Sequence, residues 1–178
     1  SSDLGFNSDL SEEIEVRPEW VSLRKAIALG KTSRVAILLS KHPDLIDYVD
    51  PKDNLMMHWV AAMSGKDEVI EYFLEKMSSE QIKSLDDNKN GLLHYALMAS
   101  SPIIGTRRDT KIPIQNIKSC VSEILDKYPD FALGENNQKI TPFVLAMFLE
   151  NLELLEILLQ KGAFVSSYSF VNNPELLH

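Results

Sequence analysis

The side chains best suited to catalysis or metal binding are few in this sequence, namely four histidines and a single cysteine. A metal site at His58 or His94 would need further histidine or cysteine ligands at close spacing, and the sequence places none beside them. Cys120 lies on an apolar stripe with Val121 and Ile124, which favours a small core residue, and a cysteine–histidine nucleophile pair has no motif to support it. The patterns GxxxxGK[ST], GxGxxG and HExxH are absent. We therefore expect no enzymatic activity and no catalytic, cofactor-binding or metal-binding residues.

Composition excludes several further classes of function. The 18 basic and 26 acidic residues give a net charge of −8, which disfavours binding to the phosphate backbone of nucleic acids. No apolar run approaches the roughly 20 residues of a membrane-spanning helix, and no charged-then-apolar leader opens the chain. One cysteine cannot form an internal disulfide. These features predict a cytoplasmic domain without nucleic-acid or membrane partners.

The elements that would position these side chains follow a recurring pattern. NLMMHWVA at residues 54–61 and NGLLHYAL at residues 90–97 share an asparagine, two aliphatic residues, a histidine and an aromatic residue, with the histidines 36 apart. LLSKHPDL at 38–45 matches ILDKYPDF at 124–131, and TPFVLAM at 141–147 is a third variant of the first motif. No stretch alternates apolar and polar residues with the period of a strand. We therefore predict an all-α chain with internal repeats.

These motifs resemble the ankyrin repeat, in which an Asp-led turn and Thr-Pro-Leu-His precede an Ala-rich helix and a second helix ending in Leu-Leu. Residues 136–163 match best, with Thr141 and Pro142 intact. The resemblance implies an ankyrin-repeat solenoid of about four helix-turn-helix units with short hairpin-like turns over residues 20–178, after an N-terminal arm at 1–19. We place the units at 20–49, 50–85, 86–135 with an insertion at 101–115, and 136–169, followed by a partial fifth unit at 170–178.

The same register assigns local roles. The family's histidine position, which the resemblance makes structural, falls near Arg24, His58, His94 and Val144. Thr141 is expected to cap the helix that begins at Pro142. Leu55 and Gly91 take the equivalent place without a side-chain oxygen, so their helices should be less well capped.

The resemblance also points to a partner-binding surface. Two positions near the end of each first helix usually lie exposed on the concave face of the family, and here most of them are apolar: Ala28, Leu29, Met63, Ser64, Met98, Ala99, Phe148 and Leu149. A contiguous exposed apolar patch usually marks an interaction site. The open alternative is that the insertion or the N-terminal arm folds over this stripe.

Aromatic residues, turn tips and two arginines complete the candidate site. Trp59 and Tyr95 fit either binding anchors or helix packing. Arg107 and Arg108 in the insertion could bind an acidic partner or a phosphate, or they could simply keep a surface loop solvated. Lys52, Asn88 and Gln138 lie in the expected turn tips, which in the resembled family usually touch a partner. The partner-binding candidates are therefore Leu29, Lys52, Trp59, Met63, Asn88, Tyr95, Met98, Arg107, Arg108, Gln138, Phe148 and Leu149.

The expected function is recognition of another protein through the concave face and turn tips, by a chain that is monomeric in isolation and carries no cofactor. One alternative is the substrate-targeting module of a larger multidomain enzyme whose catalytic domain lies outside this chain. The style of the repeats resembles proteins that intracellular bacteria inject into host cells, which would place that module in the host cytosol. Another alternative is a structural cap whose apolar stripe packs on the chain's own insertion.

Overall fold

The computed structural model describes residues 15–101 and 111–162, and these residues are all-α, as predicted. They form nine α-helices and two 3₁₀ helices without a strand. No helix in this part of the chain is long and apolar enough to cross a membrane. In chain order the elements are α2 (Pro18–Ala28), α3 (Thr32–Lys41), η1 (Pro43–Asp47), α4 (Met57–Ser64), α5 (Asp67–Lys76), α6 (Ser79–Ile82), α7 (Leu92–Met98), α8 (Ile114–Lys127), η2 (Pro129–Leu133), α9 (Pro142–Phe148) and α10 (Leu152–Gln160).

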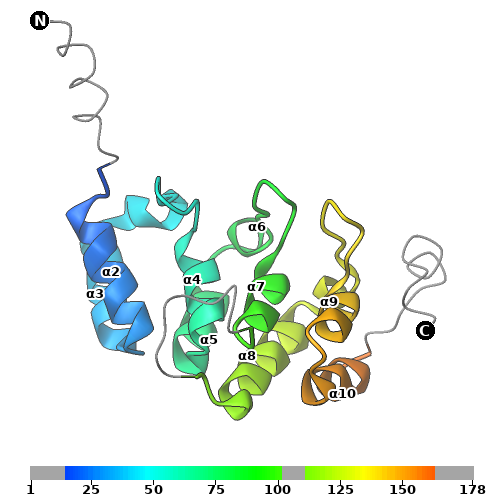
Figure 1. The fold of residues 1–178 in the computed structure, drawn as a ribbon. Coiled ribbons are helices and arrows are strands. Elements are labelled where there is room, and N and C mark those ends of the chain that lie inside the picture. The colour runs from blue at the N-terminus through cyan, green and yellow to red at the C-terminus, as the bar shows by residue number, and fades with distance from the viewer. Residues whose placement is uncertain (1–14, 102–110, 163–178) are drawn as a thin grey trace, which may run out of the picture.

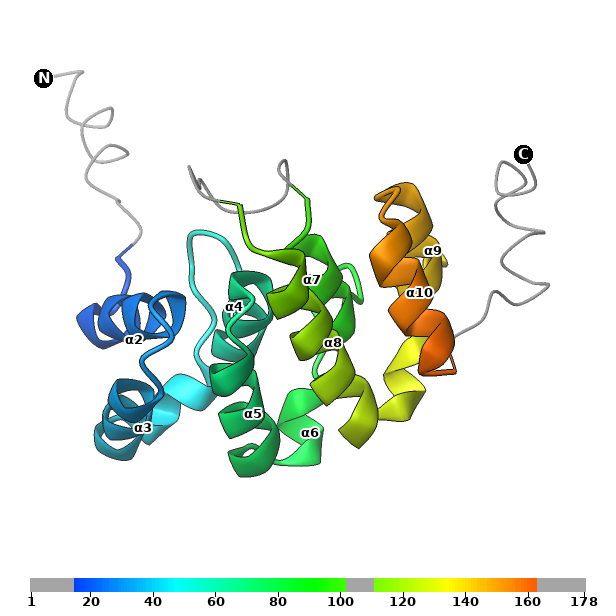
Figure 2. The ribbon, with the colours of Figure 1, turned by 90° about the horizontal axis from the view of Figure 1, so that it is seen from below.

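Eight of these helices form four pairs that stand side by side in chain order: α2 with α3, α4 with α5, α7 with α8, and α9 with α10 (Figure 1). The first helices of successive pairs pack on one another, and so do the second helices, as the view from below shows (Figure 2). One hydrophobic cluster runs through all four pairs, from Trp20 in α2 to Leu158 in α10. Each pair therefore buries its apolar face mainly against its neighbours.

The helix starts agree with the capping expected from the sequence. Thr141 Oγ1 accepts a hydrogen bond from the Val144 N–H at 3.3 Å, with Pro142 in the first turn. The helices α4 and α7 begin without a side-chain cap. The residue before α4 is Met56, one position later than the expected Leu55.

The second pair of matching segments adopts one local structure twice. In both, a helix ends at a lysine and a proline then begins a short 3₁₀ helix, so that α3 leads into η1 and α8 leads into η2. The proline suits this first position because its fixed φ favours a helical turn and its missing N–H is not needed there.

Two expected boundaries need correction. The helix α2 begins at Pro18, inside the stretch assigned to the arm. The helix α8 begins at Ile114, so the end of the expected insertion at 101–115 is helical. The helix α8 has 14 residues, whereas the other second helices have 9 or 10. An amphipathic sequence continued toward Pro113 gives α8 about one extra turn. Residues 1–14 of the expected arm and the partial unit at 170–178 lie outside the described residues.

Gly65 is where the segment before α8 meets α4. Its φ of +66° is in the left-handed region, and a Cβ built there would lie 2.6 Å from Ile112 Cγ2. Gly30 has nearly the same φ, +69°, but its Cβ would meet only the flexible Lys66 side chain at 3.3 Å. A comparison of substitutions at the two glycines therefore separates the cost of backbone strain from the cost of close packing.

We expect Gly65→Ala to lower the free energy of unfolding by about 2 kcal/mol, because strain at positive φ adds to overpacking against Ile112. Gly30→Ala should cost about 1 kcal/mol, from strain alone. Urea unfolding of both variants, followed by circular dichroism, measures the difference. Equal losses would show that Ile112 yields without cost.

Candidate interaction surface

Three turns of similar construction precede the helices α4, α7 and α9 and rise on one side of the molecule (Figure 1). In each turn two backbone hydrogen bonds close a short hairpin: Asp50 N–H to Leu55 O, Asp86 N–H to Asn90 O and Asn136 N–H to Ile140 O, with the return bonds to Asp50 O, Asp86 O and Asn136 O. A residue with positive φ stands three positions before each helix: Asn54, Lys89 and Lys139. These features fix the register of the three turns independently of the side chains.

The first residue of each turn organises its tip through a side-chain oxygen. Asp50 Oδ1 accepts from the Lys52 N–H at 2.8 Å, Asp86 Oδ1 from the Asn88 N–H at 2.8 Å, and Asn136 Oδ1 from the Gln138 N–H at 2.9 Å. Asp and Asn favour such turns because their short side chains reach the backbone two residues on. Lys52, Asn88 and Gln138, which were expected as contact residues, therefore occupy one equivalent, exposed position in successive turns.

The last two turns are also joined to each other. Asn137 donates its backbone N–H to Asn88 O at 2.9 Å and its side-chain Nδ2–H to Asp87 O at 3.2 Å. Asn136 Nδ2 donates to Asn90 Oδ1 at 3.0 Å. These bonds hold the tips of the two turns at a fixed separation.

His94 supports this arrangement from below. Its Nδ1 accepts from the Gly91 N–H at 3.1 Å and its Nε2–H donates to Ile140 O at 2.9 Å, so it links the start of α7 to the next turn. Burial lowers the pKa of His94, although the bond to Ile140 and the charge of Asp86 act in the opposite direction. Tyr95 O–H donates to Asp86 Oδ2 in the same turn. The structural role expected of His94 is confirmed.

His58 does not share that role, which corrects the register derived from the sequence. His94 and Val144 are the third residues of α7 and α9, whereas His58 is the second residue of α4 and Trp59 is the third. His58 Nε2 instead lies 3.2 Å from Ser84 Oγ, and its Nδ1 has no hydrogen-bond partner among the described residues. The turn before α4 has one more residue between its closing pair than the other two, which displaces the histidine by one position.

At the Arg24 position the first turn is held by an ion pair. Asp50 is buried, and its Oδ2 accepts from Trp20 Nε1 at 2.8 Å and from Arg24 at 3.0 Å. Arg24 also pairs with Asp53 near the tip. Trp20 and Asp50 were not among the residues expected at this surface. The acidic or amide residues at 50, 86 and 136, two places before each tip, form a pattern that points to Asp50 but not to Trp20.

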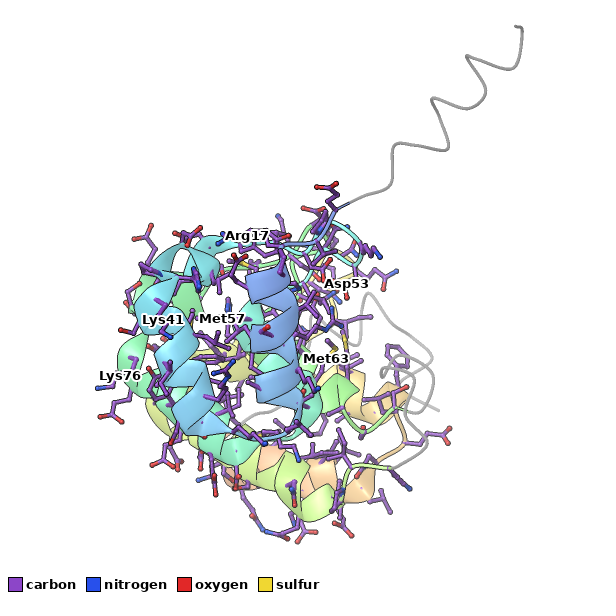
Figure 3. All side chains as sticks on the ribbon, turned by 90° about the vertical axis from the view of Figure 1, so that its left-hand side faces the viewer. Arg17, Lys41, Asp53, Met57, Met63 and Lys76 are labelled. Atoms are coloured by element: carbon purple, nitrogen blue, oxygen red, sulfur yellow. The ribbon has the colours of Figure 1, made fainter. Side chains whose placement is uncertain are left out.

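The expected apolar contact residues differ in exposure. Leu29 and Phe148 are exposed, while Met98 and Leu149 are half-buried. Met63 is buried, contrary to the exposure expected of it, and it lies on the same side of the row as Asp53, away from Lys41 and Lys76 (Figure 3). The exposed apolar stripe is therefore interrupted at α4.

Trp59 and Tyr95 are helix-packing residues in this structure. Their rings stack with centroids 5.2 Å apart and an interplanar angle of 14°, and both side chains are buried. The stack joins α4 to α7 beneath the turns. Arg107 and Arg108 lie outside the described residues.

The single cysteine of the chain is also in the core. Cys120 is buried in α8, and burial, followed by the charges of Asp67 and Glu123, raises the pKa of its thiol to about 12. In the part of the chain that the structure describes, no three His, Cys, Asp or Glu side chains are grouped so that they could hold a metal ion.

Comparison with known protein families finds no model that matches this chain, and no curated protein matches it either.

Proposed function

We propose that this chain is an ankyrin-like solenoid that binds a partner protein in the cytoplasm through its turn tips and the exposed side of its first helices. The support for the solenoid is the side-by-side packing of four helix pairs and the common construction of three turns. Solenoids of this kind present extended surfaces made of equivalent positions in successive units.

The observation that carries the proposal is the row formed by Lys52, Asn88 and Gln138. All three side chains are exposed, and the backbone N–H of each donates a hydrogen bond to the side-chain oxygen of the first residue of its turn. Because the bonds from Asn137 to the preceding turn fix the last two tips, binding would cost little ordering of the backbone. The tips would supply specificity through polar contacts.

Apolar contact area would come from Leu29 and Phe148, with Met98 and Leu149 contributing their exposed edges. Trp59 and Tyr95 support this surface from within rather than touching the partner. The roles of His94 and Cys120, one bonded to backbone and the other buried, favour a binding module over an enzyme.

Affinity capture with quantitative mass spectrometry tests this function. The bait is the full chain, compared with a tip variant (Lys52→Ala, Asn88→Ala, Gln138→Ala) and a face variant (Met98→Asp, Phe148→Asp). We expect a set of proteins that the native bait retains and that both variants lose by at least about tenfold, because interface centres concentrate the binding energy.

The matched control is Leu133→Asp, which also adds an acidic group at an exposed leucine but lies on η2, outside the proposed surface. This variant should retain the same proteins as the native bait. Identical capture by all the folded baits would contradict the proposed function.

A further inference from the structure

Each second helix has a side that faces the next pair along the row. The helices α3, α5 and α8 can be aligned on the lysine at their last position, and α3, α5 and α10 on their first residue. This alignment defines equivalent positions in the four second helices. One such position is fully buried in the first three second helices, at Val35, Ile70 and Val121. Four residues later, Leu74 and Leu125 are buried and Leu39 is half-buried. Each of these three helices packs against the next second helix in the row.

The helix α10 has the same apolar positions without such a cover among the described residues. Leu155 is half-buried, Leu159 is 55% exposed and Leu152, one turn before Leu155, is 78% exposed. Seven residues separate Leu152 from Leu159, so the three leucines share one stripe of the helix. Exposed Glu156 borders this stripe.

The opposite end of the row carries the other half of the same kind of contact. On α8 and α10, the positions that face backward pack on the preceding second helix; Lys127 Nζ donates to Leu74 O, and Lys161 Nζ lies 2.6 Å from Asp126 Oδ1. On α3 the equivalent lysine is Lys41, which is labelled on the end of the row that faces the viewer in Figure 3. Its neighbours on this side are Arg34, which is exposed, and Ile37, which is 47% exposed.

We propose that a second copy of this chain docks head to tail, with its α3 placed against the leucine stripe of α10. The internal contacts of α3 with α5, of α5 with α8 and of α8 with α10 are three examples of this interface within one chain. Ile37 would add to the leucine stripe, and Lys41 would take the place that Lys127 and Lys161 take within the chain.

The charges of the two ends are complementary. The exposed charged residues of α10 are Glu153 and Glu156, whereas α3 carries Arg34 and Lys41 and no acidic residue. Opposite charges on two contacting surfaces steer association and fix its orientation. The contact uses the ends of the row and leaves the proposed partner-binding surface free.

A head-to-tail assembly differs from the monomer expected from the sequence. Because the two contacting faces differ, the interface is heterologous, and a head-to-tail dimer still exposes one free α10 face and one free α3 face. The association therefore continues beyond the dimer as concentration rises.

Sedimentation velocity of the full chain over a series of concentrations tests the proposal. The native chain should sediment as species that grow past the dimer. The variant Leu152→Glu plus Leu159→Glu blocks the α10 face, and Ile37→Glu plus Lys41→Glu blocks the α3 face. Each should weaken association by at least about tenfold, because a buried apolar contact becomes an unpaired charge. Leu133→Glu on η2 is the matched control and should associate like the native chain.

A mixture of the two blocked variants tests whether the α3 face of one copy binds the α10 face of another. Each variant keeps one intact face, so the mixture should form a one-to-one dimer that cannot grow further. A native chain that stays monomeric at every concentration would overturn the proposal. Undiminished association of the α3 variant would overturn it in favour of a symmetric α10 contact. Circular dichroism of each variant verifies the fold.

Discussion

Replacing Asp50 with alanine should lower the free energy of unfolding by about 3 kcal/mol, because it removes the buried carboxylate of an ion pair and leaves the Nε1–H of buried Trp20 without its acceptor. Asp50 is 4% exposed and accepts hydrogen bonds from Trp20, Arg24 and the Lys52 N–H. The first two donors belong to α2 and the third to the turn tip. The substitution therefore loosens the first pair from the second and the tip from its support at the same time.

The neighbouring Asp53 supplies the control. Its side chain is 36% exposed and also pairs with Arg24, so Asp53→Ala should cost only about 0.5 kcal/mol. Urea unfolding near neutral pH measures both variants. A loss for Asp50→Ala no larger than that for Asp53→Ala would contradict the role assigned to the buried carboxylate.

The same cluster gives Asp50 a defined pH dependence. Burial opposes its ionisation, but the hydrogen bonds from Lys52, Trp20 and Arg24 outweigh burial and lower the pKa of Asp50 below its ordinary value of 3.8. The folded state therefore binds the proton less tightly than the unfolded state. The stabilisation is complete above pH 3.8 and is lost as the pH falls below it.

The sequence predicted the type of element and much of the turn chemistry. The helical periodicity predicted the helices, and Thr141 was correctly predicted to cap one of them. The turn tips expected at residues 52, 88 and 138 occupy equivalent positions in the structure. These features depend on local interactions within a few residues, which a single sequence records directly.

The register of the histidines could not be predicted in the same way. His58 and His94 stand in matching strings, but one extra residue in the turn before α4 moves His58 by one helical position. A shift of one residue rotates a side chain by about a third of a helical turn, so its partner changes from turn backbone to Ser84. Turn length, rather than the motif, decides this.

Exposure on the first helices depended on contacts between distant residues. Met63, Met98 and Phe148 are similar in polarity, yet only Met63 is buried. The nearby end of α4 packs against Ile112, which follows 47 residues after Gly65. Periodicity does not report packing by a segment this far along the chain.

The displaced His58 leads to a second large effect, a loss of stability in mild acid. Burial lowers the pKa of His58 to about 4 from an ordinary value of 6.5. The folded state thus binds a proton more weakly than the unfolded state, so the stabilisation is complete above pH 6.5 and is lost as the pH falls toward 4. Because of this one group, the free energy of unfolding should be about 2 kcal/mol lower at pH 5 than at pH 8.

The variant His58→Gln removes the titrating group while keeping an amide that can bond to Ser84. It should reduce the difference in unfolding free energy between pH 8 and pH 5 by about 2 kcal/mol, measured by urea unfolding at both pH values. Ser84→Ala is the control that separates burial from hydrogen bonding. Because it removes the partner of Nε2 but leaves the imidazole buried, it should lower stability while keeping the native pH difference. If Ser84→Ala removed the pH difference, the hydrogen bond rather than burial would control the protonation of His58. An unchanged pH difference in His58→Gln would instead assign the acid sensitivity to other groups, of which His94, with a pKa also lowered by burial, is the first to test.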